Sequence, residues 1–292
     1  MKFAGTVVLY NPEQDILENI QTYLPFLERL YVMDNSTKEY NFLDEIKNIK
    51  KVKYISLEGN QGIAKALKVA TETAIHDGYD FLLSMDQDSK FPTEDFEYVK
   101  KHLENNTISD IGIVGINFAD SLIKSNTEDK FETKEVNSLI TSGSFLNLKN
   151  YKMIDGYDEQ LFIDGVDDDI CYQLQLKNYK VVILPNIYLN HNLGNRQEVR
   201  FFGKKLKILV HSPIRYYYMY RNYHYLKKYR SKEYVQLLKT KANNFDFKHF
   251  IKRTILEKNR LKNFKMIKKG IKDGKRGILG PYQERRKSRW RF

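Results

Sequence analysis

The chain has 292 residues, of which 41% are hydrophobic and 29% are charged, with only 15 glycines and 6 prolines. These values argue against a disordered or fibrous protein, and the length allows one large α/β domain with an extension or two modest domains. The single cysteine excludes a disulfide framework and a Cys-rich zinc site. There is no run of about 18 apolar residues, and the N-terminus lacks the layout of a signal peptide. We therefore expect a cytoplasmic protein without membrane-spanning helices.

Charge is divided unevenly along the chain. Residues 1–199 hold 20 Lys and Arg against 32 Asp and Glu, whereas residues 200–292 hold 29 against 5. This change of sign indicates an anionic partner for the C-terminal part, either nucleic acid or an anionic membrane. No recognisable nucleic-acid-binding motif is present, and a nucleic-acid binder would leave the acidic N-terminal part without a role. We therefore favour the membrane and expect no nucleic-acid partner.

Short apolar runs alternate with amphipathic segments in the first third of the chain. Strands are expected at 3–10, 30–33, 52–57 and 81–85, and helices at 13–27, 41–50 and 63–76. Strands that alternate with helices at this spacing predict a mostly parallel sheet with crossover helices, which is an α/β fold.

The remainder of the chain is less regular. We expect a strand at 111–118, a loop at 120–135, a strand or hairpin within 136–148, a helix within 162–175, and a strand at 180–184 that Pro185 closes. Seven tyrosines then crowd the segment 216–229, a pattern more typical of packing than of a binding site. Basic helices are expected at 233–243 and 246–270, and a basic tail follows.

Acidic residues gather where predicted strands end or a helix begins. Asp34 follows one strand, Asp86 and Asp88 follow another, and Asp167 lies in an acidic run that opens a helix. Ligands of open α/β sheets bind outside the carboxyl ends of the strands. Two carboxylates at this spacing can hold a hard divalent cation while a diphosphate completes its shell. The structural alternatives are a turn for Asp34, a helix cap for Asp88 and a favourable helix-dipole interaction for Asp167.

Several motifs occur in a fixed order, and their combination is more specific than any one of them. They are Val7-Val8-Leu9-Tyr10-Asn11-Pro12, Val32-Met33-Asp34-Asn35-Ser36, Asn60-Gln61-Gly62, Met85-Asp86-Gln87-Asp88-Ser89, Thr141-Ser142-Gly143-Ser144, Phe162-Ile163-Asp164-Gly165-Val166-Asp167 and His191-Asn192-Leu193-Gly194. In this combination the chain resembles the inverting glycosyltransferases of family 2, which have the GT-A fold, and among them the bacterial rhamnosyltransferases. The segment 211–218 and the pair Arg221-Asn222 carry the finer resemblance.

The resemblance implies a nucleotide-sugar site. Five residues would border the donor: Tyr10, Asn11, Asn60, Ser142 and Gly143. Asp34 would accept a hydrogen bond from N3–H of uracil or thymine, and Asp86 would lie beside the ribose or deoxyribose.

The resemblance also implies the residues that act in the reaction. Asp88 would ligate Mg²⁺ or Mn²⁺, His191 would lie near the metal or the diphosphate, and Asp167 would be the general base. The chain departs from the family at two positions, with Lys68 in place of an Asn and Gln173 in place of an Arg that would contact the diphosphate. Three arginines are open as replacements: Arg196, Arg200 and Arg215.

The implied reaction is a single displacement with inversion. A base removes the acceptor hydroxyl proton, a metal stabilises the leaving diphosphate, and both substrates are held in line. We expect transfer of L-rhamnose from dTDP-β-L-rhamnose to a lipid-linked glycan in bacterial polysaccharide synthesis, with an α-L-rhamnoside as the product. Galactofuranose, glucose and GlcNAc stay open as donor sugars. An inactive scaffold is disfavoured because the acidic residues are intact.

We expect a GT-A catalytic domain over residues 1–225 and a basic, aromatic-rich helical extension over 226–292. Apolar residues between 247 and 271 recur with Lys and Arg between them, which is typical of helices that lie on anionic lipid. Residues 200–292 would therefore bind the inner face of the cell membrane peripherally. The alternatives for the extension are a homodimer contact and packing of solvated basic helices on the catalytic domain.

Overall fold

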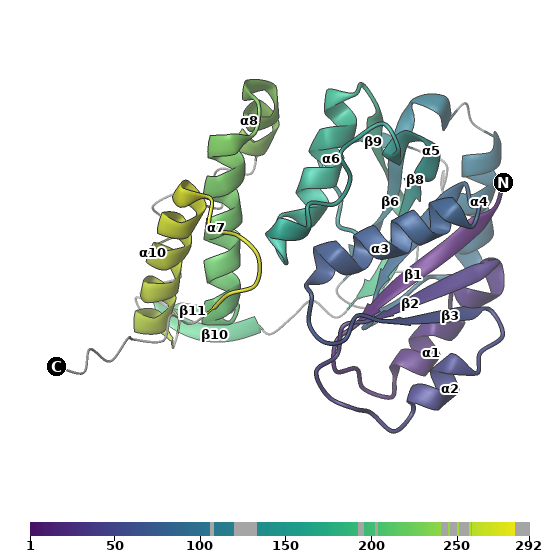
Figure 1. Cartoon of the computed structure of the whole chain (residues 1–292), viewed down its shortest axis with the longest axis horizontal. Coiled ribbons are helices and arrows are strands. Elements are labelled where there is room, and N and C mark those ends of the chain that lie inside the picture. Colours follow the sequence, from purple (N-terminus) through teal and green to yellow (C-terminus); the bar gives the residue numbers. More distant parts are fainter. Residues whose placement is uncertain are drawn as a thin grey trace.

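A computed structural model describes residues 1–105, 108–119, 133–191, 196–201, 204–240, 245, 250, 257 and 259–283. Within these ranges nine strands form one mixed sheet, and a hairpin and a group of helices follow it (Figure 1). The strand order across the sheet is β3-β2-β1-β4-β8-β6-β9-β5, with β7 paired to β9. The predicted α/β fold is confirmed.

The N-terminal half of the sheet is parallel. Its strands are β1 (Phe3–Leu9), β2 (Arg29–Asp34), β3 (Val52–Ser56) and β4 (Phe81–Asp86), and the connecting helices are α1 (Ile16–Gln21), η1 (Leu24–Phe26), α2 (Leu43–Lys47) and α3 (Ile63–His76). The single helix expected at 13–27 is wrong. Pro25 lies in the first turn of the separate 3₁₀ helix η1, where its missing N–H leaves no lost bond.

The other half of the sheet is mixed. It contains β5 (Ser89–Lys90), β6 (Ile111–Ala119), β7 (Lys134–Glu135), β8 (Ser144–Asn147) and β9 (Lys180–His191), with helices α4 (Thr93–Asn105), η2 (Ile108–Asp110), α5 (Leu148–Tyr151), η3 (Glu159–Leu161) and α6 (Val166–Leu176). Strand β8 runs antiparallel to both β4 and β6, whereas β6 and β9 are parallel.

Two sequence expectations fail in this half. Strand β9 does not end before Pro185, because Leu184 pairs with Ile116 while Tyr188 pairs with Asn117. The residues between them bulge out of the ladder, and a proline fits there because it has no N–H to donate. The loop expected at 120–135 ends in β7, while its residues 120–132 lie outside the described ranges.

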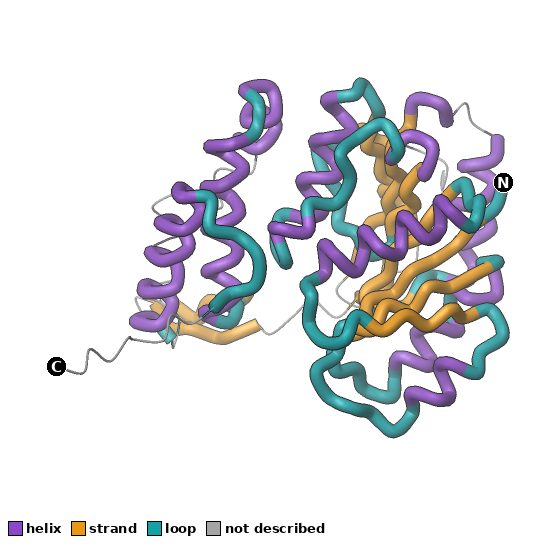
Figure 2. Tube along the Cα trace, viewed as in Figure 1, coloured by secondary structure: helices purple, strands orange, loops and turns teal. Residues whose placement is uncertain are grey.

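Helices cover both faces of the sheet (Figure 2). Side chains of β1 alternate between two apolar clusters, with Phe3 and Val7 in one and Ala4 in the other. The first cluster includes residues of α1, α2 and α4, and the second includes residues of α3 and α6. The strand ends are therefore fixed between two packed layers.

The C-terminal part consists of the hairpin β10 (Arg196–Phe201) and β11 (Lys204–Leu209) and the helices α7 (Pro213–Tyr229), α8 (Lys232–Lys239) and α10 (Arg260–Arg276). Most of the clustered tyrosines are buried in α7, so the packing interpretation is confirmed. The single helix expected at 246–270 is wrong, since Glu257 and Asn259 are not helical and α10 begins at Arg260. The expected domain boundary at residue 225 falls inside α7.

Helix α10 packs closely on α7 through two glycines. A Cβ atom on Gly270 would overlap the carbonyl oxygen of Tyr217, and one on Gly274 would overlap that of Arg221. Only residues without a side chain allow the two backbones to approach this closely.

We expect Gly274→Ala to lower the free energy of unfolding by about 1–3 kcal/mol, because the added methyl group must push α10 away from α7. Urea denaturation measures this loss. The matched control is Lys272→Ala on the exposed side of the same helix, which should change stability by less than about 0.5 kcal/mol. Equal effects of the two variants would contradict the close packing of the helices.

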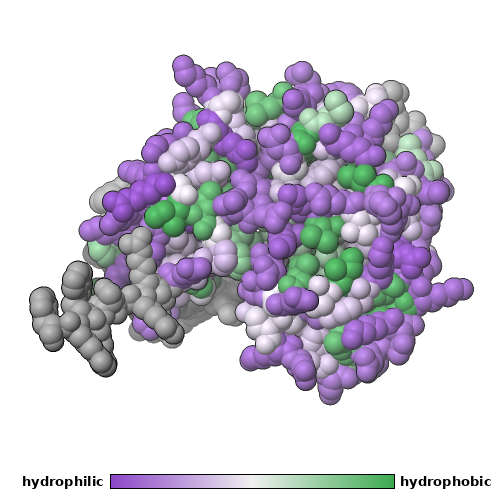
Figure 3. Space-filling view, in the orientation of Figure 1, coloured by the Kyte–Doolittle hydropathy of each residue, from purple (hydrophilic) through white to green (hydrophobic). Residues whose placement is uncertain are grey.

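The surface shown in Figure 3 is mostly hydrophilic, with hydrophobic residues in small groups. None of the helices in the described ranges has the length and apolarity required to cross a membrane.

Candidate functional site

The carboxyl ends of three neighbouring strands meet at one edge of the sheet. Strand β1 lies between β2 and β4, and in their registers Leu9 pairs with Asp34 while Val8 pairs with Asp86. Neighbouring strands are about 4.8 Å apart, so the backbones at Asp34 and Asp86 lie roughly 10 Å apart. These two acidic residues therefore belong to one site.

Asp34 is buried and held by three hydrogen bonds. Its Oδ1 accepts from Ser36 N at 2.9 Å, which is the turn contact expected of an Asp at a strand end. Its Oδ2 accepts from Tyr54 Oη at 2.7 Å and from Tyr40 Oη at 3.0 Å. Burial and the hydrogen bond to Asp34 raise the pKa of Tyr54 to about 12, so its hydroxyl remains a donor at neutral pH.

The segment after β1 is tied to the loops that follow β2 and β4. Tyr10 N donates to Gln87 Oε1 at 2.8 Å, while the Tyr10 side chain is exposed. Asn11 has a left-handed backbone (φ 45°), and its Oδ1 accepts from Thr37 N at 3.0 Å and from Lys38 N at 3.1 Å. The backbone at the strand end is thus fixed, and the Tyr10 ring faces solvent beside it.

The loop before α3 is anchored to the same edge. The buried Asn35 accepts a hydrogen bond from Gln61 N at 2.7 Å through Oδ1, and Asn60 Oδ1 accepts from Gly62 N at 3.1 Å. Gly62 has a φ of 86°, and a Cβ atom there would clash with the backbone of Phe162. The Asn60 loop and the loop before α6 therefore touch, and glycine is required at their contact.

Ser142 and Gly143 support the end of β4. Asp86 N donates to Ser142 Oγ at 3.0 Å, and Ser142 Oγ donates to Ser89 Oγ at 3.0 Å. Gly143 N donates to Ser84 O at 2.8 Å and adopts a φ of 76°. Both residues lie next to Asp86, and the buried Ser142 hydroxyl positions the turn that carries it.

Asp88 is exposed in this turn. The helix-cap alternative for it is wrong, because Ser89 belongs to β5 and α4 begins only at Thr93. In the β5–β9 ladder the Cα atoms of Ser89 and His191 are partners. The backbone of His191 therefore lies beside the Asp88 turn, while its side chain lies outside the described part of the structure.

Three of the predicted acidic residues interact electrostatically. Burial raises the pKa of Asp86 to about 7, with further contributions from the charges of Asp167 and Asp88, while Arg215 acts in the opposite direction. Asp88 and Asp167, which belong to different elements, are thus each close enough to Asp86 for their charges to act on it. We refer to these three residues as the acid cluster.

The acid cluster fits a hard divalent cation that is completed by a ligand. No group of three or more His, Cys, Asp or Glu side chains in the described ranges is arranged to hold an ion by itself. Mg²⁺ sites commonly use one or two carboxylates together with substrate phosphates rather than an all-protein cage. The carboxylates of Asp86 and Asp88 offer the oxygen donors of such a site.

Asp167 and Asp169, both in the acidic run at the start of α6, have different hydrogen-bond partners. Asp167 Oδ1 accepts a hydrogen bond from Thr141 Oγ1, which joins it to the Ser142 segment. Asp169 is buried instead and accepts from Gln173 Nε2 at 2.7 Å, Tyr234 Oη at 2.7 Å and Arg230 Nη2 at 3.1 Å. Burial raises the pKa of Asp169 to about 6 against these partners. Asp169 therefore ties α6 to the C-terminal helices.

Gln173, which was expected to stand in place of an arginine, is also part of the packing. Its Nε2 donates to Gly156 O at 3.0 Å as well as to Asp169. Of the three candidate arginines, Arg215 is the one whose side chain is described, and its Nε donates to Asp164 Oδ1 at 3.1 Å. The side chains of Arg196 and Arg200 lie outside the described ranges.

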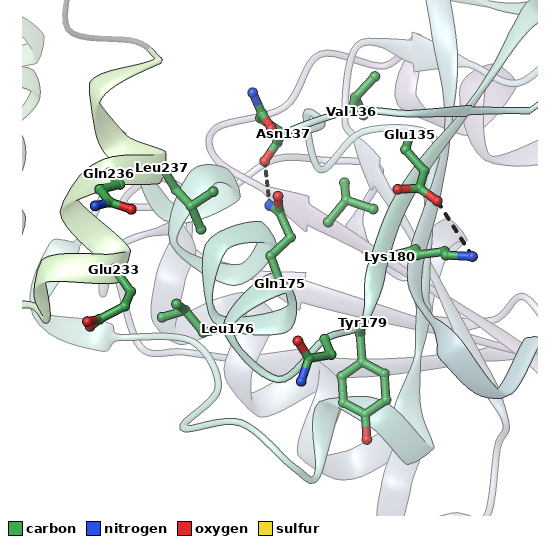
Figure 4. A pocket seen from close by; sticks show the side chains of 12 residues that line it. Glu135, Val136, Asn137, Gln175, Leu176, Tyr179, Lys180, Glu233, Gln236 and Leu237 are labelled. Carbon is green, nitrogen blue, oxygen red and sulfur yellow. Dashed lines mark hydrogen bonds and ion pairs between the residues drawn. The ribbon is translucent and has the colours of Figure 1, made fainter.

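A cavity among the described residues lies elsewhere. It measures about 610 Å³ and is lined by residues at the C-terminal end of α6, by β7 and β9, and by α8 (Figure 4). Gln175 and Leu176 line it, whereas the acid cluster is near the opposite end of α6. The cavity is therefore separate from the strand-end site.

Sequence reasoning assigned no role to Tyr40, Tyr54, Thr141 and Asn35. Thr141 and Asn35 lie within the quoted motifs, so their position in the motif was the available signal. The two tyrosines reach Asp34 from positions 6 and 20 residues away, and no local pattern marks them.

Comparison with known proteins identifies a close sequence relative. The chain is 29% identical over 295 residues to the dTDP-rhamnosyl transferase RfbF of Shigella flexneri, covering 94% of this chain and 96% of the relative.

Solved structures share the fold at low identity. S. aureus TarS matches with a TM-score of 0.58 and 18% identity over 90% of this chain, and GalNAc-T7 with UDP, GalNAc and Mn²⁺ matches with a TM-score of 0.59 and 13% identity over 80%. This chain spans about half of each, 47% and 49% respectively. The sequence profile described as Glycosyl transferase family 2 matches residues 6–159, more than half of the chain. The chain therefore belongs to glycosyl transferase family 2.

Proposed function

We propose that this protein transfers L-rhamnose from dTDP-β-L-rhamnose to a lipid-linked glycan, with inversion at the anomeric carbon. The observation that carries the proposal is the similarity to a dTDP-rhamnosyl transferase along almost the whole length of both chains. The strand-end site supports it, because its acidic residues suit a nucleotide base, a divalent cation and an acceptor hydroxyl.

The donor's base binds at Asp34. A thymine presents N3–H as a donor, and a carboxylate fixed by Ser36, Tyr40 and Tyr54 is an acceptor in a set position. Tyr10 follows Leu9, the strand partner of Asp34, and its exposed ring can cover the base by stacking. Uracil presents the same N3–H and cytosine does not, so this contact selects uracil or thymine but does not select the sugar.

The acceptor hydroxyl is deprotonated by Asp167. Its carboxylate is oriented by Thr141 Oγ1 and lies close enough to Asp86 for the two charges to interact. General-base catalysis needs such an oriented carboxylate beside the attacking oxygen. No carboxylate has to act as a covalent nucleophile, so a single displacement inverts the anomeric centre.

Asp88, with Asp86 beside it, would hold Mg²⁺ or Mn²⁺, and His191 is the candidate further ligand because its backbone pairs next to Asp88. When bound, the ion supplies positive charge that stabilises the leaving diphosphate. The Mn²⁺ in the GalNAc-T7 structure, a protein of similar fold, supports this assignment.

A donor screen tests the proposal. The purified protein is incubated with dTDP-β-L-rhamnose, UDP-galactofuranose, UDP-glucose or UDP-GlcNAc and Mg²⁺ or Mn²⁺, and released nucleotide diphosphate is measured. We expect turnover with dTDP-β-L-rhamnose, with the Asp167→Asn variant as the background control. Turnover of one of the UDP-sugars instead would assign the protein to that sugar and overturn the rhamnose proposal.

We further propose that the C-terminal part binds the inner face of the cell membrane, where a lipid-linked acceptor is presented. The outward side of α10 is basic and carries exposed apolar residues, including Leu261 at 75% exposure and Phe264 at 43%. Lys265, Lys268 and Lys272 are exposed on the same helix. A helix of this kind lies on an anionic lipid surface with its apolar residues in the interface.

Replacing Lys265, Lys268 and Lys272 together with Gln should weaken binding to vesicles that contain phosphatidylglycerol. Each basic residue near such a surface contributes about 1 kcal/mol, so we expect about a 100-fold loss of affinity in vesicle co-sedimentation at low salt. The control is Lys101, Lys152 and Lys177 replaced with Gln, which are exposed lysines of the catalytic domain. Equal losses in both variants, or no binding by the unmodified protein, would contradict the proposal.

A further inference from the structure

The loop between η3 and α6 has an unusual backbone. Phe162, Asp164 and Gly165 adopt φ values of 64°, 69° and 77°, and only the last of them is a glycine. Left-handed backbone at residues with a side chain persists where the surrounding structure holds it in place. Because Asp167 follows two residues later, the path of this loop determines where its carboxylate lies.

Asn222 of α7 binds the main chain of this loop. Its side-chain Nδ2 donates to Leu161 O at 3.0 Å, Ile163 O at 2.8 Å and Asp164 O at 2.6 Å. The three acceptors span the left-handed segment, and Asn222 is buried. The two hydrogens of one amide group are therefore shared among three carbonyl groups of the loop and fix their direction.

Arg221 holds the preceding residues in the same way. It is fully buried, and its Nη2 donates to Gln160 O at 3.1 Å and to Leu161 O at 2.8 Å. Its Nη1 donates to Gly280 O, and its Nε donates to Asn222 Oδ1 at 2.9 Å. A buried guanidinium is unfavourable unless its donors are satisfied. These contacts with main-chain carbonyls indicate a specific requirement for the shape of the loop.

The loop 160–165 contacts the Asn60 loop on one side and Arg215 on the other. Phe162, at its centre, lies against Gly62 of the Asn60 loop, and Ala64 N donates to Phe162 O at 3.3 Å. On its other side, Asp164 receives the hydrogen bond from Arg215 Nε. A shift of the loop would therefore change the position of Asp167 relative to Asp86 and to the donor.

We propose that Arg221 and Asn222 are positioning residues for the transfer reaction, which hold the loop 160–165 so that Asp167 lies in its working position beside Asp86. The inference rests on the proposed role of Asp167 as the general base. It makes α7, which lies outside the matched family profile at residues 6–159, part of the machinery of catalysis rather than only of the C-terminal packing.

The test measures hydrolysis of dTDP-β-L-rhamnose with Mn²⁺, in which water is the acceptor, together with donor affinity by calorimetry. A small misplacement of a catalytic group can lower the rate by about 100-fold, so we expect that loss of kcat in Asn222→Ala and in Arg221→Lys. Donor Kd should change by less than about threefold, because the loop is not the principal donor contact.

The matched control is Tyr216→Phe, on the same helix and five residues before Arg221. It removes the 2.5 Å hydrogen bond from Tyr216 Oη to Glu257 Oε1 and so weakens the packing of α7 without touching a loop carbonyl. We expect it to keep the unmodified kcat. A fall in kcat as large as that of Asn222→Ala would show that general loosening of α7 is sufficient, which overturns the proposal.

Gly165→Ala provides a second variant if Asn222→Ala does not fold. A methyl group there meets its nearest neighbours at 3.9 Å, so it fits, but alanine disfavours the left-handed backbone. We expect a folded protein with reduced kcat and unchanged donor Kd. Full kcat in Gly165→Ala and in the folded Asn222 or Arg221 variant would overturn the proposal.

Asp167→Asn in the same assay separates the two proposals. If Asp167→Asn is inactive while Asn222→Ala keeps full kcat, the positioning role is wrong and the base assignment stands. If Asp167→Asn keeps full kcat, the base assignment fails, and the positioning role fails with it.

Discussion

Asp167→Asn should lower kcat by about 10²–10⁴-fold, the usual contribution of general-base catalysis. The amide cannot accept the proton of the acceptor hydroxyl, yet it has the size of the carboxylate and can still accept the hydrogen bond from Thr141. Donor Kd should stay nearly unchanged, because the base acts on the acceptor. The measurements are kcat with a lipid-linked or synthetic acceptor and donor Kd by calorimetry.

The neighbouring acids provide the controls. Asp168→Asn should lower kcat much less than Asp167→Asn does. Asp169→Asn should act on stability instead, because Asp169 is buried against Arg230, and removal of one partner of such a pair costs about 3–5 kcal/mol. If Asp168→Asn proves inactive while Asp167→Asn remains active, the base is the next residue along the helix. If both remain active, Asp164 is the next candidate.

The parts of the fold that sequence predicted are those with a local signal. The strands β1, β2, β3 and β4 are short apolar runs bounded by turn residues, and the residues that follow parallel strands necessarily meet at one edge of the sheet. The closeness of Asp34 and Asp86 follows from that rule without any knowledge of side-chain positions.

The parts that sequence did not predict depend on contacts between distant residues. Pro185 ends a strand by local rules, but the register shift opposite Ile116 and Asn117 allows β9 to continue past it. Nothing near Asp34 in sequence indicates that Tyr54 donates to it. The sequence marked Arg221 only as part of the resemblance, and nothing near it in sequence indicates that it is fully buried and donates to main-chain carbonyls some 60 residues away.

The electrostatics of the site were only partly foreseen. Like charges around Asp167 were expected from its own acidic run, but Asp169 is turned into the packing with Arg230. The carboxylates that act on the site come from different elements: Asp86 ends β4, Asp88 lies in the turn after it, and Asp167 lies on α6. Because tertiary packing sets this arrangement, the order of the motifs could suggest it, whereas the spacing of the residues alone could not.

Asp88→Ala should lower kcat by about 1,000-fold, since the charge stabilisation that a divalent ion supplies to a leaving diphosphate is worth several kcal/mol. Folding should be unaffected because Asp88 is exposed. Metal-dependent binding of dTDP, measured by calorimetry with and without Mn²⁺, should weaken in the variant. The matched control is Asp155→Ala, an exposed acid on another segment, which should retain both turnover and binding.

Metal removal tests the same assignment without a mutation. EDTA should abolish turnover by the unmodified protein, and added Mg²⁺ or Mn²⁺ should restore it, because the carboxylates of Asp86 and Asp88 repel the diphosphate unless a cation lies between them. Asp88→Ala should not be restored by the same ion concentration. Unchanged turnover in EDTA would remove the metal from the mechanism, and Arg215, whose charge already acts on Asp86, would then be the candidate for stabilising the diphosphate.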